Sequence, residues 1–221
     1  MPGLLEDLKK QTFTDFEIIV ADNSSSDSTR AIARRFGCCI VKGGSPSVGR
    51  NNGAARAKGT WLVFIDADTR LPDPNFLLKL HRVVNKLSGH KIVLLPYVKF
   101  WGSKEFWKLM GNIYFYPLHK QIGFLKDFAY GGVIITPRRF FEELGGFPPD
   151  VRFTEDTHFT KKARAKGGQV LRVPLSVLTS DRRLGINYIL RLSFINLLRP
   201  LYSVNGRIKV LIERIYWGED S

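Results

Sequence analysis

Cysteine is scarce in this sequence of 221 residues, which has only Cys38 and Cys39, side by side. A disulfide between neighbouring cysteines is strained, so a disulfide framework is excluded and a reducing, cytosolic setting is expected. Long apolar runs are missing too, because no uncharged stretch reaches the roughly 18 residues of a membrane-spanning helix. The stretch 1–10 has no apolar core and carries two acids, so we expect no secretion signal. These absences predict a cytoplasmic protein.

Acidic residues are few relative to basic ones, with 20 Asp and Glu against 34 Lys and Arg and a net charge of +14. Either the charge reflects a generally basic proteome, or it serves anionic partners such as phosphorylated ligands, nucleic acid or acidic lipid. No module that reads nucleic acid is recognisable, so we do not expect nucleic acid as a partner. Ser-His-Asp, HExxH, paired CxxC and GxxxxGK[ST] patterns are absent, which excludes the chemistries that depend on them.

Strand and helix patterns alternate along the first third of the chain. This βαβαβ order predicts an α/β fold with a mostly parallel sheet sandwiched by helices. Such sheets bind ligands beyond the carboxyl ends of their strands, so polar residues at those ends become candidate site residues. In order, we expect a strand at 16–20, a helix at 28–36, a strand at 39–41, a helix at 47–58 and a strand at 61–65.

The chain divides by composition into an α/β domain at 1–180 and a helical tail at 181–221. The tail is basic and apolar, because the stretch 184–212 has four basic residues and no acid. Such a tail either lies on an anionic membrane surface or packs on the domain, which leaves peripheral attachment to the inner face of the cell membrane open. Within the domain, we further expect a helix after Pro74, strands at 92–98, 131–135 and 170–173, and helices that begin at Pro137 and Thr154.

Acidic residues come directly after two of the predicted strands. Asp66 and Asp68 follow the third strand, and two carboxylates so close together can hold Mg²⁺ or Mn²⁺ against the phosphates of a ligand. Asp22 and Asn23 follow the first strand, where the carboxylate can accept hydrogen bonds from a base or a ribose. Each acid also has a structural alternative as part of a turn or a helix cap.

Charged residues also lie at the starts of two predicted helices. Arg50 can pair with a phosphate or clamp a carboxylate of the site, or it can be a solvated surface arginine. Glu155 and Asp156 lie in a first helical turn, where the macrodipole stabilises negative charge. One of these acids can equally act as a general base that deprotonates a hydroxyl. His158, two positions further on, is interpreted as incidental.

Four segments are similar to motifs of one known enzyme family. In this order and at this spacing, over about residues 4–175, they resemble a family 2 glycosyltransferase with the GT-A, Rossmann-like fold. The resemblance implies that 1–180 is the catalytic domain. The segments are 8–25, similar to LxxQTxxxFEIIVxDxSS; 49–55, similar to ARNxGxxxA; 61–72, the strand with its D-x-D loop; and 131–156, with a GG strand, a GGF turn and an ED motif.

The resemblance implies a donor site for a UDP- or GDP-linked sugar. Asp22 would hydrogen-bond the base, with Asn23 beside it, and Arg50 would support the nucleotide and the acid of the metal site. Asp66 would contact the ribose or the sugar. Asp68 would bind the divalent cation, Mn²⁺ or Mg²⁺, that bridges the diphosphate. The metal site would therefore consist of Asp68 and Asp66.

The resemblance also implies an inverting transfer in one displacement. Asp156 would be the catalytic base, with Glu155 beside it, and would take the proton of the acceptor hydroxyl. Gly131 and Gly132 would leave room for the donor sugar and the acceptor.

The acceptor is less well defined by the sequence. The QxxRW motif of polymer synthases is absent, so we expect transfer of a single sugar. Arg182 and Arg183 lie in the comparable region, where they either help to hold a phosphate or form a solvated junction. The aromatic and basic stretch 97–126 either lines a site for a lipid-linked acceptor near a membrane or forms ordinary core with snorkelling lysines. The acceptor group is expected to be a hydroxyl or a phosphate, on a lipid-linked or glycan partner.

The beginning of the sequence departs from the family pattern. Family members begin with a strand of the form SVIIPTYNE, central in the sheet, whereas here 1–3 lead directly into the first helix. A missing central strand leaves backbone groups of its neighbours unpaired. We therefore expect a start codon assigned too late, a shortened chain or an impaired protein. The alternative to an active transferase is accordingly a catalytically impaired relative that binds a nucleotide or a membrane.

Overall fold

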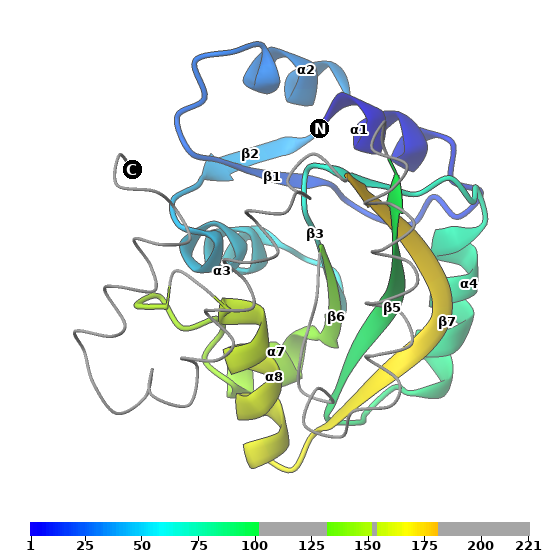
Figure 1. Cartoon of the computed structure of the whole chain (residues 1–221), viewed down its shortest axis with the longest axis vertical. Helices are drawn as coiled ribbons and strands as arrows, with labels where there is room; N and C mark the ends of the chain where they lie inside the picture. Colours follow the sequence, from blue (N-terminus) through cyan, green and yellow to red (C-terminus); the bar gives the residue numbers. More distant parts are fainter. Residues whose placement is uncertain (102–131, 152–153, 181–221) are drawn as a thin grey trace.

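The computed structural model describes residues 1–101, 132–151 and 154–180 of the chain. They form an α/β fold in which helices cover both faces of a central sheet (Figure 1), so the predicted fold class is confirmed. None of the helices in these three ranges combines the length and the apolar character needed to cross a bilayer. The predicted tail at 181–221 lies outside the described residues.

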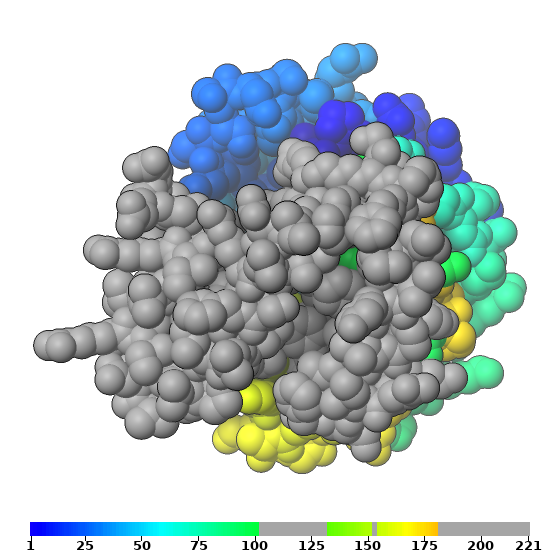
Figure 2. Space-filling view, in the orientation of Figure 1, coloured from blue at the N-terminus to red at the C-terminus, as the bar shows by residue number. Residues whose placement is uncertain are grey.

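The N-terminal part contains two parallel strands between helices. After α1 (Pro2–Lys9), β1 (Ile19–Asp22) pairs with β2 (Cys39–Lys42), and the two strands run in the same direction. Their connection, α2 (Thr29–Arg35), forms part of the outer surface, in blue at the upper edge of Figure 2. The helix after β2, α3 (Pro46–Arg56), packs on the other side of the strand pair (Figure 1).

The larger sheet is mixed and has the strand order β3-β6-β5-β7-β4. The strand β6 is antiparallel to both of its neighbours, whereas β5 and β7 run parallel to each other. Because Ile65 at the end of β3 pairs with Val133 at the start of β6, the loop after β3 lies beside the residues before β6. The strands are β3 (Trp61–Ile65), β4 (Thr69–Arg70), β5 (Ile92–Trp101), β6 (Val133–Pro137) and β7 (Gln169–Ser180).

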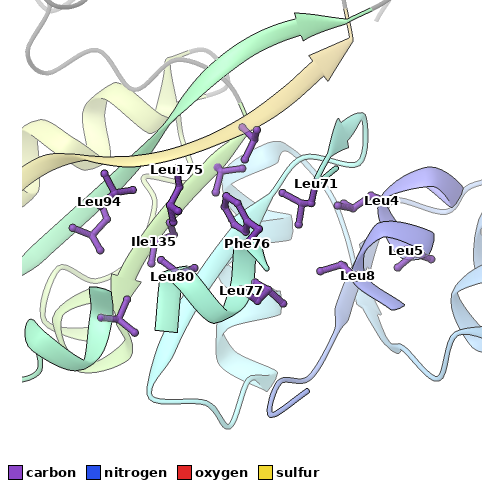
Figure 3. Packing of buried hydrophobic residues seen from close by; sticks show 14 of the residues in the cluster. Leu4, Leu5, Leu8, Leu71, Phe76, Leu77, Leu80, Leu94, Ile135 and Leu175 are labelled. Carbon is purple, nitrogen blue, oxygen red and sulfur yellow. The ribbon is translucent and has the colours of Figure 1, made fainter. Parts of the chain in front are cut away.

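The strand β5 is shared by two hydrophobic clusters. Alternate side chains point to opposite faces of a strand, so Leu94 packs on one face and Val93 on the other, each 0% exposed. The Leu94 face is covered by α1 and α4 (Phe76–Lys86). In Figure 3, Leu80 of α4 lies beside Ile135, and the leucines of α1 extend the same cluster beyond Leu71. The Val93 face is covered by α7 (Arg138–Glu143) and α8 (Glu155–Ala165). Burial of each such side chain contributes about 1.5–3 kcal/mol.

Polar side chains of α1 and of the turn that follows it attach this helix to the chain after β4. The buried carboxylate of Asp7 accepts hydrogen bonds from Arg70 Nε at 2.6 Å, Arg70 Nη2 at 2.8 Å and the Leu71 amide at 2.8 Å. Gln11 donates to the Asp73 carbonyl at 3.0 Å and accepts from the Leu77 amide at 2.9 Å. These bonds link α1 to the segment between α4 and the loop after β3 that contains Asp66 and Asp68, here called the acidic loop.

The structure differs from the sequence prediction in the first strand and in strand pairing. Strand β1 begins at Ile19 rather than Phe16, since Glu17 is drawn to the amides of Lys58 and Gly59. Strand β3 pairs with β6 and does not extend the parallel pair β1–β2, because no strand of the described ranges lies between β1 and β3 to join them.

The structure also differs in the last helix and the last strand. Thr154 occupies the N-cap position of α8 as predicted, but its backbone is left-handed, with φ 59°, and its side chain makes no capping bond. Strand β7 continues to Ser180 because it pairs with β5 on both sides of a register shift between Leu95 and Tyr97. Local patterns identify these elements, but long-range pairing sets their length.

Candidate active site

The helix α3 begins at the end of the β1–β2 pair. Ser45 caps it by accepting from the Val48 amide at 3.5 Å, and Pro46 supplies a favourable first residue. Gly49, in the first turns, packs against Ala21 of β1, where an added Cβ would lie 3.4 Å from the Ala21 Cβ. Asn52 donates to the Lys42 carbonyl at 2.8 Å. The cap at Ser45 and the packing of Gly49 fix the helix that carries Arg50.

Arg50 joins two acids that are distant in the sequence. Its Nη2 lies 2.9 Å from Asp66 Oδ1 after β3, and its Nη1 lies 2.5 Å from Glu155 Oε1 in α8. The guanidinium carbon also lies 5.2 Å from the centre of the Phe147 ring. Burial opposes the charge on Arg50, but Asp66 and Glu155 outweigh it and raise the pKa of the guanidinium. The sequence alternative of a solvated surface arginine is therefore excluded.

Asp156 lies beside Glu155 in the first turn of α8. Its Oδ1 accepts from the Thr157 amide at 2.6 Å. Loss of solvent around the carboxyl, and then repulsion from Glu155, raises its pKa to about 7, whereas the charge on Arg50 lowers it. A carboxyl group with a pKa near neutrality can accept and return a proton at physiological pH, which suits a general base.

The acidic loop after β3 is closed by backbone contacts with the start of β6. The Asp66 amide donates to the Gly132 carbonyl at 2.7 Å. Gly132 has φ +83°, and an added Cβ would lie 2.7 Å from Thr69 Oγ1. A side chain at this position would collide with Thr69, so the local packing of the loop favours glycine at position 132.

The carboxylate of Asp68 is half-buried and makes no hydrogen bond or ion pair with the residues that the structure describes. Asp66 shares only Oδ1 with Arg50. The two side chains thus retain free carboxylate oxygens, the ligand type that Mg²⁺ and Mn²⁺ prefer. The described ranges contain no group of three or more His, Cys, Asp or Glu that could hold a metal ion alone. The residues present therefore fit a cation held jointly by Asp66, Asp68 and a phosphorylated ligand.

Asp22 lies at the end of β1 with its side chain 3% exposed. Its Oδ2 accepts from the Ser25 amide at 3.3 Å and lies 3.6 Å from Arg30 Nε, so the predicted turn role is present. Its Oδ1 is buried and has no hydrogen-bond partner in the described part of the chain. A buried acceptor without a donor is costly, and a ligand N–H would satisfy it. Asn23 is exposed beside it.

The structure brings together some of the predicted site residues and separates others. Arg50 contacts both Asp66 and Glu155, and Asp156 interacts electrostatically with all three. No hydrogen bond or ion pair between described residues joins Asp22 to this group, and α3 connects the two places. Three predicted residues, Gly131, Arg182 and Arg183, lie outside the described ranges.

Two residues near Arg50 were not among the predicted site residues. Asn51 makes two hydrogen bonds with the backbone of Phe147, and the Phe147 ring lies against Arg50. Asn51 lies in the segment 49–55 and Phe147 in the segment 131–156. Both segments carry the family resemblance, so the sequence did contain information that could have pointed to these residues. Their connection could not be deduced because 96 positions separate them.

Sequence comparison identifies the family. The model described as "Glycosyl transferase family 2" matches residues 1–167. The chain belongs to glycosyl transferase family 2. The predicted family assignment is therefore confirmed.

One curated relative in glycosyl transferase family 2 is the "PGL/p-HBAD biosynthesis glycosyltransferase" of Mycobacterium bovis (strain BCG / Pasteur 1173P2). It is 29% identical over 109 residues, which cover 42% of this chain and 40% of the relative. The chain thus spans less than half the length of this relative.

Two solved structures share the fold. The mannosyltransferase PcManGT from Pyrobaculum calidifontis, in complex with GDP-Man and Mn²⁺, gives a TM-score of 0.66 at 18% identity, covering 97% of this chain and 65% of that one. S. aureus TarS 1–349, in complex with UDP, gives 0.62 at 19% identity, covering 89% and 61%. These likenesses support the GT-A architecture.

Proposed function

We propose that this member of glycosyl transferase family 2 transfers one sugar from a UDP- or GDP-linked donor to a hydroxyl or phosphate acceptor, with inversion. The observation that carries the proposal is the position of Arg50 between Asp66 and Glu155, with Asp156 adjacent. The arrangement joins an acidic loop suited to a cation with a carboxyl group suited to accept a proton. The solved structures of PcManGT with GDP-Man and Mn²⁺ and of TarS with UDP support the donor class.

The donor would extend from Asp22 to the acidic loop. The free Oδ1 of Asp22 would accept a hydrogen bond from a base N–H, with Asn23 beside it. Asp68 and Asp66 would hold a divalent cation, Mn²⁺ or Mg²⁺. When bound, that cation supplies positive charge against the diphosphate leaving group. Arg50 adds a second, protein-borne positive charge at the same place.

Asp156 would act as the general base. It would take the proton of the acceptor hydroxyl while the hydroxyl oxygen forms a bond to the anomeric carbon of the sugar. The bond from that carbon to the donor phosphate oxygen breaks, and its electron pair leaves with the nucleoside diphosphate. Glu155, held by Arg50, lies beside Asp156 and raises the proton affinity of the base.

The acceptor site would include Gly131 and Gly132, with Arg182 and Arg183 as phosphate contacts. A lipid-linked acceptor at an anionic membrane surface is supported by the net charge of +14 and by the exposed Arg30, Arg34 and Arg35 around α2. Co-sedimentation with anionic liposomes at low salt tests this part. Loss of binding upon removal of 184–221 is expected, whereas no binding by the full chain would contradict a membrane-bound acceptor.

A catalytically impaired nucleotide-binding relative is the second candidate function. It is favoured by the separation of the β1–β2 pair from the five-stranded sheet within the described residues. Under this reading Asp22 would still bind a nucleotide, but no sugar would be transferred.

The two candidates are separated by two measurements on the full chain. Calorimetry with UDP and with GDP, each with Mn²⁺, measures nucleotide binding. Hydrolysis of UDP- and GDP-linked sugars, followed by release of the nucleoside diphosphate, measures turnover. Binding with turnover supports the transferase, binding without turnover supports the impaired relative, and the absence of both contradicts the proposed donor site.

A further inference from the structure

Asn51 forms a two-bond clamp on the chain that leads to α8. Its Nδ2 donates to the Phe147 carbonyl at 2.9 Å, and its Oδ1 accepts from the Phe147 amide at 2.9 Å. One side chain thereby satisfies both backbone groups of a residue that is 0% exposed. The pairing resembles one rung of a sheet ladder, made by an amide side chain from a helix.

The backbone around this clamp is adapted to it. Gly145 and Gly146 precede Phe147 with φ of +66° and +72°, and an added Cβ at Gly146 would lie 2.6 Å from Asn51 Oδ1. Consecutive left-handed residues are readily adopted only by glycine. The two glycines therefore turn the chain and leave room for the amide of Asn51.

The Phe147 ring contacts both Arg50 and the helix α8, which carries Glu155 and Asp156. On one side the Arg50 guanidinium lies over it, with 5.2 Å between the guanidinium carbon and the ring centre. On another it stacks on Phe159 of α8, with 4.5 Å between the ring centres. Phe159 follows Asp156 by less than one helical turn. The position of Phe147 thus affects both Arg50 and the helix that carries Glu155 and Asp156.

A second bond from the same helix reaches the same segment. Ser47 Oγ donates to the Val151 carbonyl at 3.2 Å, shortly before α8 begins. Residues 47, 50 and 51 of α3 therefore contact the chain at Val151, Glu155 and Phe147. The segment before α8 is attached at several points to the helix that carries Arg50.

We propose that Asn51 is a positioning residue, which acts through Phe147 to hold Asp156 in register with Asp66 and Arg50. This role rests on the proposed function of Asp156 as the base. Asn51 would not touch the substrate. Its loss would leave the donor contacts in place but allow the first turn of α8 to shift relative to the acidic loop.

The test uses Asn51→Ala, with Asn52→Ala as its matched control. Asn52 is the next residue of α3 and also donates to a backbone carbonyl, but that carbonyl belongs to Lys42 of β2. For Asn51→Ala we expect kcat for donor turnover to fall by about 10²-fold, the loss typical of a reacting group displaced by about 1 Å. The donor KM and the affinity for UDP or GDP should stay within twofold of the wild type, and Asn52→Ala should turn over normally.

Hydrogen exchange gives a readout that does not depend on activity. Asn51→Ala should speed amide exchange at Gly145, Gly146 and Phe147 and in the first turn of α8, with exchange in β5 and β7 unchanged. Unchanged exchange at 145–160, or an equal increase throughout the chain, would overturn the positioning role. Absence of turnover in the wild type would instead contradict the proposed function, and the exchange result would still decide the role of Asn51.

Phe147→Leu provides a second variant, which keeps an apolar side chain and both backbone bonds but removes the ring. It should reproduce the loss of kcat, and the double variant should lose little more than either single one, because both changes break the same connection. Losses that simply multiply would show that the two residues act separately and would contradict the proposal.

Discussion

Arg50 and Glu155 form an ion pair across 105 positions of sequence, with 2.5 Å between Nη1 and Oε1. The pair joins α3 to the first turn of α8, and the second nitrogen of the same guanidinium reaches Asp66. The charge that supports the acidic loop thus also lies next to the candidate base.

Replacement of Arg50 should change the pH dependence of the reaction. The positive charge of Arg50 lowers the pKa of Asp156, so Arg50→Gln should raise that pKa above its value of about 7. The acidic limb of the profile of kcat/KM against pH should then move to higher pH, and the rate at neutral pH should fall. Arg56→Gln, at the other end of α3, is the control and should leave the profile in place.

Asp156→Asn should reduce turnover by about 10²–10⁴-fold, the usual contribution of a general base. Asparagine keeps the size of the side chain but cannot take a proton. Affinity for UDP or GDP with Mn²⁺, measured by calorimetry, should be retained. Turnover close to that of the wild type would show that Asp156 is not the general base.

The same residue should make the fold less stable as pH rises. An acid whose pKa is about 7 in the folded chain, and 3.8 as an ordinary aspartate, binds more protons in the folded state between these values. The free energy of unfolding therefore falls as pH increases across this window. In Asp156→Asn this slope should be smaller, and Tm at pH 8 should be higher than in the wild type. An identical slope in both proteins would show that the Asp156 carboxyl ionises as it does in water.

Asp22→Asn should lower the affinity for the nucleotide more than it lowers kcat. The buried Oδ1 of Asp22 lacks a donor, and we expect a base N–H to fill that role. In the variant the Kd for UDP or GDP should rise by about tenfold, equivalent to about 1.4 kcal/mol, with kcat at saturating donor little changed. Asp27→Asn is a suitable control, because Asp27 is exposed and its carboxylate accepts from the nearby Thr29 amide.

Asp7→Asn should lower the free energy of unfolding by about 1.5–3 kcal/mol, the contribution of a hydrogen bond to a charged group. Arg70, followed by the Leu71 amide, lowers the pKa of Asp7 below its ordinary 3.8. The stability it contributes is therefore present above pH 4 and lost as pH falls through the lowered pKa. Urea denaturation at pH 7 measures the effect, with the exposed Glu6→Gln as control.

Local sequence patterns predicted most of the helices and strands. The helix predicted at 47–58 and the helix predicted after Pro74 depend only on neighbouring residues. Both form close to these positions, as α3 (Pro46–Arg56) and α4 (Phe76–Lys86). The partner of β3 was not predictable in this way, because antiparallel pairing with β6 is decided by residues more than 60 positions away.

The sequence indicated which acidic residues belong to the candidate site, but it did not indicate all of the contacts that join them. Asp66, Asp68, Glu155 and Asp156 were identified from acids at strand and helix ends together with the family resemblance. The contact of Arg50 with an acid of the loop was expected from the resemblance, but its second contact, with Glu155, was not, because 105 positions separate the two residues. The Asn51 clamp was missed for a related reason, because an asparagine near a helix start is usually explained by local bonds.

Four successive residues of α3 contact four different parts of the molecule. Gly49 packs on β1, Arg50 reaches the acids, Asn51 holds Phe147 and Asn52 reaches β2. Neighbouring helical residues differ by about 100° in direction. Deleting a single residue ahead of Gly49 would therefore rotate every one of these side chains toward the wrong neighbour, and the region should tolerate exchanges of side chain far better than changes of length.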